Sequence, residues 1–109
     1  MPNTTVEFLD NLYTATLDRE LTAEEKTELL KKLDESIRDA EWILKEKMPA
    51  RPRAIQLNDL IAKLKAEISN IKAGIDPLCH YSLIRPYMDS NIAWLQAGCP
   101  EEDPLLPIK

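Results

Sequence analysis

The stretch MPARPRA, residues 48–54, joins two segments that repeat one hydrophobic pattern, and it decides the fold. Pro49 and Pro52 make this connection short and stiff, and Pro49 also disfavours helix at Met48. Both flanking segments carry apolar residues at spacings of three and four, the period of a helix with one buried face. These residues are Leu30, Leu33, Ile37, Ala40 and Leu44 before the prolines, and Leu57, Leu60, Leu64, Ile68, Ile71 and Ile75 after them. We therefore predict that helices over 22–47 and 54–74 fold back as a long antiparallel hairpin.

The ends and the charges of the two helices agree with this hairpin. Thr22 can cap the first helix, and Glu25, three residues later, completes the pattern of a capping box. Gly74 is suited to stop the second helix, because glycine adopts the left-handed conformation that often follows a helix. Residues 1–46 hold twelve acids and six bases, net −6, whereas residues 47–73 hold two acids and six bases, net +4. An acidic helix is thus expected beside a basic one.

The rest of the chain predicts three shorter helices. Residues 5–17 place several apolar side chains on one broad face. Asp76 and Pro77 resemble an N-cap and a first helical residue, which predicts a short helix over 77–84. Pro86 then breaks this helix and opens another over 86–97. The last helix is expected to pack on the face of 54–74 opposite the leucine stripe, where the residues are small: Ala62, Ala66, Ser69 and Ala73.

The predicted fold is therefore all-α. It is a small bundle of four to five helices in a single domain over residues 1–98, built on the long hairpin. Residues 99–109 contain three prolines and cannot be helical throughout, so we expect an extended or flexible C-terminal tail.

The composition of the chain gives an expectation for the cellular location of the protein. The chain has 109 residues, of which 44% are hydrophobic and 30% charged, as in an ordinary soluble domain. It has no apolar run near the roughly 20 residues that cross a bilayer, and its first residues lack the pattern of a secretory signal. Two cysteines are too few for a disulfide framework. We expect a cytoplasmic protein with free thiols and no membrane partner.

The sequence gives little support for catalysis or metal binding. The only soft ligands are Cys79, His80 and Cys99, and adjacent Cys-His on a helix does not form the paired clamp of a zinc site. No nucleophile motif accompanies the single histidine, and Gly74 and Gly98 lie outside any glycine-rich phosphate loop. We expect no enzyme activity, no metal and no cofactor. A disulfide between Cys79 and Cys99 is an alternative that sequence alone leaves open, because it gives no distance between them.

Two nucleic-acid hypotheses remain as alternatives. The predicted hairpin tip gathers cations that could touch phosphate: Lys45, Lys47, Arg51 and Arg53. The net charge of −5 opposes this, as does the lack of interleaved aromatic residues or a recognition helix. Conversely, the acids of residues 1–46 could mimic nucleic acid and inhibit a nucleic-acid-binding protein, although interleaved lysines and Arg38 dilute that charge.

Trp42 is the most informative residue for function. With Ile37, Ala40 and Leu44 facing the core, Trp42 projects to the opposite, charged side of its helix. It could be covered within the monomer, anchor another protein, or close a homodimer. Tryptophan is enriched in interface hot spots, and surrounding charges would form a polar rim. We predict a non-catalytic interaction protein: an adaptor, assembly chaperone, immunity protein or inhibitor. Its predicted partner-binding residues are Trp42, Glu35, Asp39, Glu46, Arg51 and Arg53.

Overall fold

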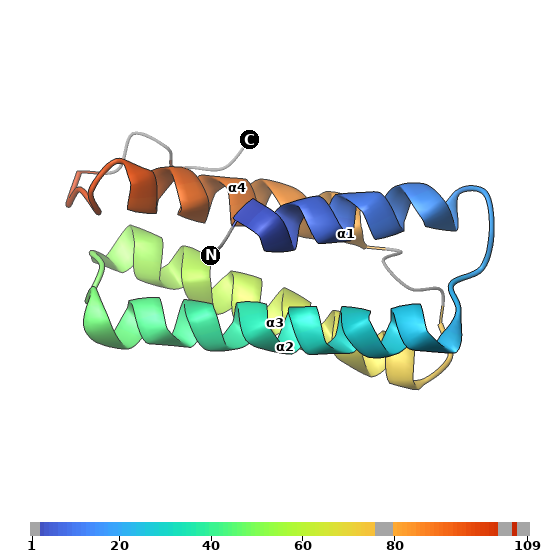
Figure 1. Ribbon diagram of the computed structural model, residues 1–109. Coiled ribbons are helices and arrows are strands. Elements are labelled where there is room, and N and C mark those ends of the chain that lie inside the picture. The colour runs from blue at the N-terminus through green and yellow to red at the C-terminus, as the bar shows by residue number, and fades with distance from the viewer. Residues whose placement is uncertain (1–2, 76–79, 103–105, 107–109) are drawn as a thin grey trace.

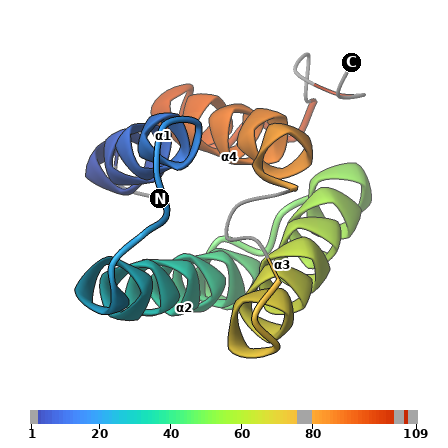
Figure 2. The ribbon, with the colours of Figure 1, turned by 90° about the vertical axis from the view of Figure 1, so that its right-hand side faces the viewer.

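Four α-helices make up the regular structure of the described residues, with no strand among them. The computed structural model describes residues 3–75, 80–102 and 106. The helices are α1 (Asn3–Thr16), α2 (Ala23–Glu46), α3 (Arg51–Lys72) and α4 (Tyr81–Gln96). Successive helices run in opposite directions, with α1 and α4 above α2 and α3 (Figure 1). Viewed from the end, the four helices lie at the corners of a square (Figure 2). The predicted all-α class is confirmed.

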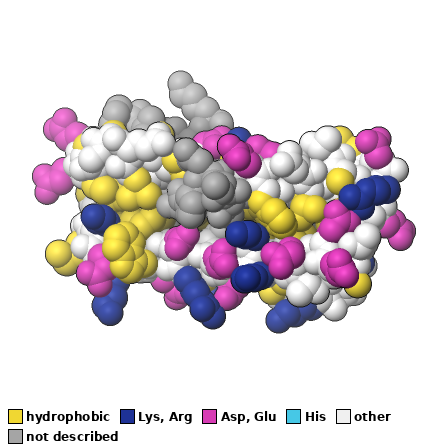
Figure 3. Space-filling view, in the orientation of Figure 1, with side chains coloured by type: hydrophobic (Ala, Val, Ile, Leu, Met, Phe, Trp, Pro, Cys, Tyr) yellow, Lys and Arg dark blue, Asp and Glu magenta, His cyan; other side chains and the backbone are white. Residues whose placement is uncertain are grey.

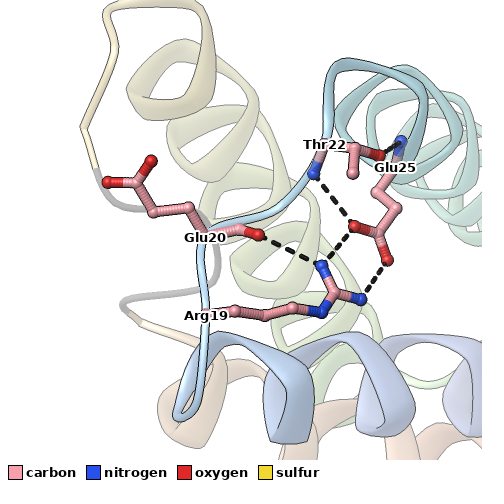
Figure 4. Close-up of polar contacts among 4 residues, drawn as sticks. All are labelled: Arg19, Glu20, Thr22 and Glu25. Carbon is pink, nitrogen blue, oxygen red and sulfur yellow. Dashed lines mark hydrogen bonds and ion pairs between the residues drawn. The ribbon is translucent and has the colours of Figure 1, made fainter.

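The start of α2 forms the predicted capping box (Figure 4). Glu25 N donates to Thr22 Oγ1 at 3.1 Å, and Thr22 N donates to Glu25 Oε1 at 2.9 Å. Arg19 adds a bidentate contact that sequence did not reveal: its Nη1 and Nη2 lie 2.7 and 2.8 Å from the two oxygens of Glu25. Thr22 satisfies backbone groups that the first turn leaves open, so the helix begins where predicted.

Glu25 should make the stability of the protein depend on acid. The hydrogen bonds from Arg19, and then the one from Thr22, lower the pKa of Glu25 from 4.5 to about 2. Because the folded-state pKa is depressed, this contribution is fully present above pH 4.5 and is lost as the pH falls towards about 2. Across this pH window, the melting temperature should fall by less for Glu25→Gln than for the wild type. Glu24→Gln is the neighbouring control and should follow the wild type; parallel curves for all three would contradict the assignment.

The buried face of α2 is turned relative to the predicted stripe. Leu29 and Ile43 are fully buried, whereas the predicted Leu30 and Leu44 are only partly buried. The reason is visible in Figure 2: α2 packs on α3 at one side and on α1 at the other, so it buries a wider arc. Seven other predicted members are buried: Leu33, Ile37 and Ala40 on α2, and Leu57, Leu60, Leu64 and Ile71 on α3. The predicted Ile68 is only partly buried.

The small face of α3 does not receive α4, contrary to prediction. Ala62, Ala66, Ser69 and Ala73 are all exposed. In a square of four helices the two neighbours of α3 sit on adjacent sides, so the face opposite α2 points to solvent (Figure 2). The side of α3 that meets α4 instead carries two buried charged residues, Arg53 and Glu67. Ile75, predicted to be buried, is exposed.

Helix α4 runs through Pro86 without a break, so the predicted boundary between 77–84 and 86–97 is wrong. Proline removes one backbone hydrogen bond, to the carbonyl of Ser82, but Ser82 is exposed and water can replace it. A continuous buried row favours the single helix: Tyr81, Ile84, Met88, Asn91 and Trp94. Residues 76–79, which hold the predicted Asp76 cap and Pro77, lie outside the described residues, as does most of the predicted tail.

The remaining ends follow their local signals. Helix α3 begins at Arg51, three residues before the predicted start, with Pro52 in its first turn, where no intrahelical N–H is needed. Gly74 and Gly98 have φ of 81° and 88° directly after α3 and α4. The next residue in each case donates back across the helix end, Ile75 N to Asn70 O at 2.9 Å and Cys99 N to Trp94 O at 3.0 Å. These are Schellman ends that require the left-handed conformation at glycine.

Candidate partner-binding surface

Trp42 lies at the surface of α2 with 53% of its area exposed. Its one charged neighbour above the ring is Lys47, whose Nζ lies 5.5 Å from the ring centroid. The described residues cover only about half of the side chain, so within this part of the chain the structure does not place Trp42 in the core. A large, half-exposed aromatic side chain on a rigid helix is a common anchor of protein interfaces.

Trp42 belongs to a polar row on the flank of α2 that faces α1. The row has spacings of three and four residues, which places its members above one another on the helix. It consists of Lys32, Glu35, Asp39, Trp42 and Glu46, and we call it the Trp42 row. Its first member touches α1, because Lys32 Nζ lies 5.9 Å from the ring centroid of Phe8. Three predicted site residues, Glu35, Asp39 and Glu46, are therefore brought together with Trp42.

Helix α1 is too short to cover the far end of this row. Phe8 is five residues from the first residue of α1, so the helix extends about 7.5 Å beyond its contact with Lys32. Trp42 is ten residues beyond Lys32, about 15 Å along α2. Figure 1 shows the same relation, with α1 lying beside only the N-terminal part of α2. The described residues therefore leave the flank open around Trp42 and Glu46.

A second row on α4 borders the same open position. It consists of Arg85, Met88, Ile92 and Leu95, again at helical spacing, and begins at a contact with α1. Ile92 and Leu95 are partly buried apolar residues at the far end of α4. Figure 3 shows hydrophobic side chains between α4 and α2 at the end of the molecule that α1 does not reach. An apolar strip thus lies beside the Trp42 row.

Two acids and two bases are the helical neighbours of Trp42: Asp39 and Glu46, and Arg38 and Lys45. Glu35 lies 3.6 Å from Lys32, but neither Asp39 nor Glu46 has an ion pair with another described residue. This contrasts with Asp34 on the solvent side of α2, which is 3.0 Å from Arg38. Arg51, also predicted to bind a partner, is exposed at the first residue of α3.

Arg53 is the exception among the predicted site residues, because it is buried with only 1% exposed. Its Nη1 donates to Ser90 Oγ at 2.9 Å and to Asn91 Oδ1 at 3.0 Å, and its guanidinium lies 5.6 Å from the ring centroid of Trp94. The structure thus corrects the expectation of an exposed tip formed by all four cations. Arginine suits this position because its flat fork can donate to two acceptors while it stacks on an aromatic ring.

A polar network that sequence did not reveal attaches α1 to α4. Arg85 donates through Nε and Nη2 to the two oxygens of Asp10 at 2.9 and 3.1 Å, and the Tyr81 hydroxyl donates to the same carboxylate. The Arg85 contacts lower the pKa of Asp10, and burial raises the pKa of Tyr81. The partners are more than 70 positions apart in sequence, so no local pattern could have identified them.

Several of the remaining described titratable groups lie around one cavity. A cavity of about 230 Å³ between α3 and α4 has Lys63, Glu67, Asn70 and His80 in its lining, and His80 Nδ1 lies 3.6 Å from Glu67 Oε2. The described residues hold no group of three acidic, histidine or cysteine side chains placed for a metal ion. Cys99 has a free thiol, and Cys79 lies outside the described residues. None of the described helices has the length and apolar character needed to span a bilayer.

Comparison with protein-family models, with curated proteins and with solved structures finds no match to this chain. The chemistry and geometry of the surface around Trp42 are therefore the basis on which we infer a function.

Proposed function

We propose that this protein is a non-catalytic interaction module that binds another protein through the surface around Trp42. The observation that carries the proposal is the half-exposed Trp42 on a rigid helix, at the open end of the Trp42 row. Burial of one such ring by a partner removes a large apolar area from water, and tryptophan is the type of residue that dominates interface energies. An adaptor, an assembly chaperone, an immunity protein or an inhibitor would act in this way.

The surroundings of Trp42 suit a docking surface. Asp39 and Glu46 provide a polar rim, and Ile92 and Leu95 provide an apolar floor on the neighbouring helix. We also propose that α2 and α3 form a rigid hairpin, held by their buried leucines. The binding surface would then lose little conformational entropy when the partner binds. A cytoplasmic location is part of the proposal and agrees with the free thiol of Cys99.

The burial of Arg53 weakens the alternative in which the hairpin tip binds nucleic acid. It removes one of the four cations from the exposed tip and leaves Lys45, Lys47 and Arg51. The net charge of −5 repels a polyanion over the rest of the surface. Binding to another protein therefore has the better support.

The test is a comparison of Trp42→Ala with the matched variant Ile55→Ala. Ile55 is also an exposed apolar residue, 58% exposed, on the outer face of α3. Both variants should keep the circular-dichroism spectrum of the wild type and lie within about 0.5 kcal/mol of its stability. Trp42→Ala should weaken binding of the partner by at least about tenfold, whereas Ile55→Ala should leave it unchanged.

The measurement is quantitative mass spectrometry of proteins captured by the immobilised full chain, followed by titration of the purified partner. A captured protein that binds the wild type and Trp42→Ala equally would contradict the proposal. So would unfolding of Trp42→Ala, because it would place this side chain in the core.

A further inference from the structure

We infer that the partner presents a basic amphipathic helix, which lies end to end with α1 between α2 and α4. This inference rests on the proposed function and specifies the chemistry of the partner. It follows from the shape of the open position, from the spacing of the residues that border it, and from their charge.

The open position has the shape of a helix site. Where α1 is present, it packs between α2 and α4, with Phe8 beside Lys32 and Asp10 bonded to Arg85. Both neighbouring helices continue past the first residue of α1, by about nine residues or about 13.5 Å on α2. The helices α2 and α4 run in the same direction, and α1 packs antiparallel to both (Figure 1). A bundle position bordered by two such helices is normally filled by a third helix, at interaxial distances of about 8–10 Å.

The spacing on both borders also favours a helix. Asp39, Trp42 and Glu46 repeat at three and four residues on α2, and Ile92 and Leu95 continue such a repeat on α4. A helix with apolar residues at the same spacing can contact both rows along its length. On one face an extended strand repeats about every 6.7 Å, whereas these rows repeat about every 5.3 Å, so a strand matches their spacing less well than a helix does.

The charges favour a basic polar face on the incoming helix. Asp39 and Glu46 have no ion pair with any described residue, although other acids of α2 do. Glu101 and Glu102, just past the end of α4, are exposed. The nearby cations on α2 and at its C-cap are Arg38, Lys45 and Lys47. Arg38 already pairs with Asp34, and Lys47 lies over the ring of Trp42. Lysines or arginines of the partner would therefore meet carboxylates on both sides, and attraction between unlike charges would select this partner over an acidic one.

The test uses three synthetic peptides of about 14 residues, long enough to fill the open position. The first is an amphipathic leucine–lysine helix, the second replaces its lysines by glutamates, and the third is a scrambled leucine–lysine sequence with no apolar face. Isothermal titration with the full chain should show the first peptide binding at least about tenfold more tightly than the other two. The scrambled peptide has the same charge, so it measures attraction to an acidic protein without docking.

Charge-matched variants locate the binding. The double variant Asp39→Asn with Glu46→Gln should lower the affinity for the leucine–lysine helix about tenfold, and so should Trp42→Ala. Glu24→Gln with Glu28→Gln changes the net charge by the same amount at the other end of α2, and should change affinity by less than about twofold. Equal effects of the two double variants would overturn the inference, because binding would then follow net charge alone.

The outcomes separate this inference from the proposed function. If no peptide binds preferentially but a captured protein still depends on Trp42, the partner is not a basic helix and only this inference fails. If neither peptide nor protein depends on Trp42, both fail. If light scattering gives twice the monomer mass for the free chain, and Trp42→Ala restores the monomer mass, then the surface binds a second copy of the chain. That result would overturn the inference.

Discussion

Arg53→Ala should lower the free energy of unfolding by about 3 kcal/mol, whereas Arg51→Ala should change it by less than about 0.5 kcal/mol. The two arginines are two residues apart in the RPR sequence at the start of α3. Arg53 is buried, and its loss would remove the donor from Asn91 and Ser90, leave a cavity beside Trp94 and remove the contact with that ring. Arg51 is exposed, so its truncation removes only solvated atoms.

Urea-induced unfolding followed by circular dichroism measures both values. The midpoint should fall for Arg53→Ala at nearly unchanged slope, because a loss of stability without a change in exposed area shifts only the midpoint. Equal midpoints for the two variants would place Arg53 in solvent. Arg53→Lys should recover only part of the loss, since lysine keeps the charge but cannot donate in a flat fork while stacking on Trp94.

Trp94→Ala should lower the free energy of unfolding by about 3–5 kcal/mol, the range expected for removal of a buried large aromatic side chain. Trp94 is 1% exposed, packs under Arg53, and donates from Nε1 to Pro100 O at 3.0 Å. Trp42→Ala removes the same side chain from the surface and should cost less than about 0.5 kcal/mol. The two tryptophans thus form a matched pair in which only the buried one contributes to stability.

Because a typical domain is stable by only about 5–15 kcal/mol, Trp94→Ala could unfold much of the protein. Trp94→Phe keeps most of the ring and removes the hydrogen bond to Pro100, so its loss should be about 1 kcal/mol. Thermal unfolding should rank the variants as wild type and Trp42→Ala, then Trp94→Phe, then Trp94→Ala. A larger loss for Trp42→Ala than for Trp94→Phe would reverse the assigned roles.

The elements of this fold that sequence predicted are the ones with local signals. The capping box at Thr22 and Glu25, the prolines around residue 50 and the glycines after α3 and α4 act within a few residues. Their structural consequence therefore does not depend on the rest of the chain. The period of three and four residues likewise identified Leu33 on α2 and the buried leucines of α3, Leu57, Leu60 and Leu64, but it missed Leu29.

The predictions that were wrong concern which helix faces pack against each other. Periodicity shows that a helix has one apolar face, but it does not show how many neighbours share it, and α2 has two. The small residues of α3 permit close approach without requiring it, and they remain exposed. Pro86 looked like a boundary because its effect on the backbone is local, whereas the burial of Met88 and Trp94 that offsets it depends on tertiary packing.

The candidate surface was only partly predictable for the same reason. Helical spacing placed Trp42 with Glu35, Asp39 and Glu46, because that relation is internal to one helix. The length of α1 relative to α2, and the apolar residues that α4 brings to the same position, are tertiary facts. Arginine gives no sequence sign of its burial, and the partners of Arg53 lie 37 and 38 positions away.

The solvent exposure of Trp42 in the full chain is the central claim, and 19F NMR of the 5-fluorotryptophan-labelled protein tests it most directly. Two resonances are expected, and the Trp42→Phe variant identifies the one from Trp42. That resonance should shift when the solvent is changed from water to deuterium oxide, and the resonance of Trp94 should not. A Trp42 resonance that is insensitive to the solvent would show that the surface is covered within the monomer and would contradict the proposed binding site.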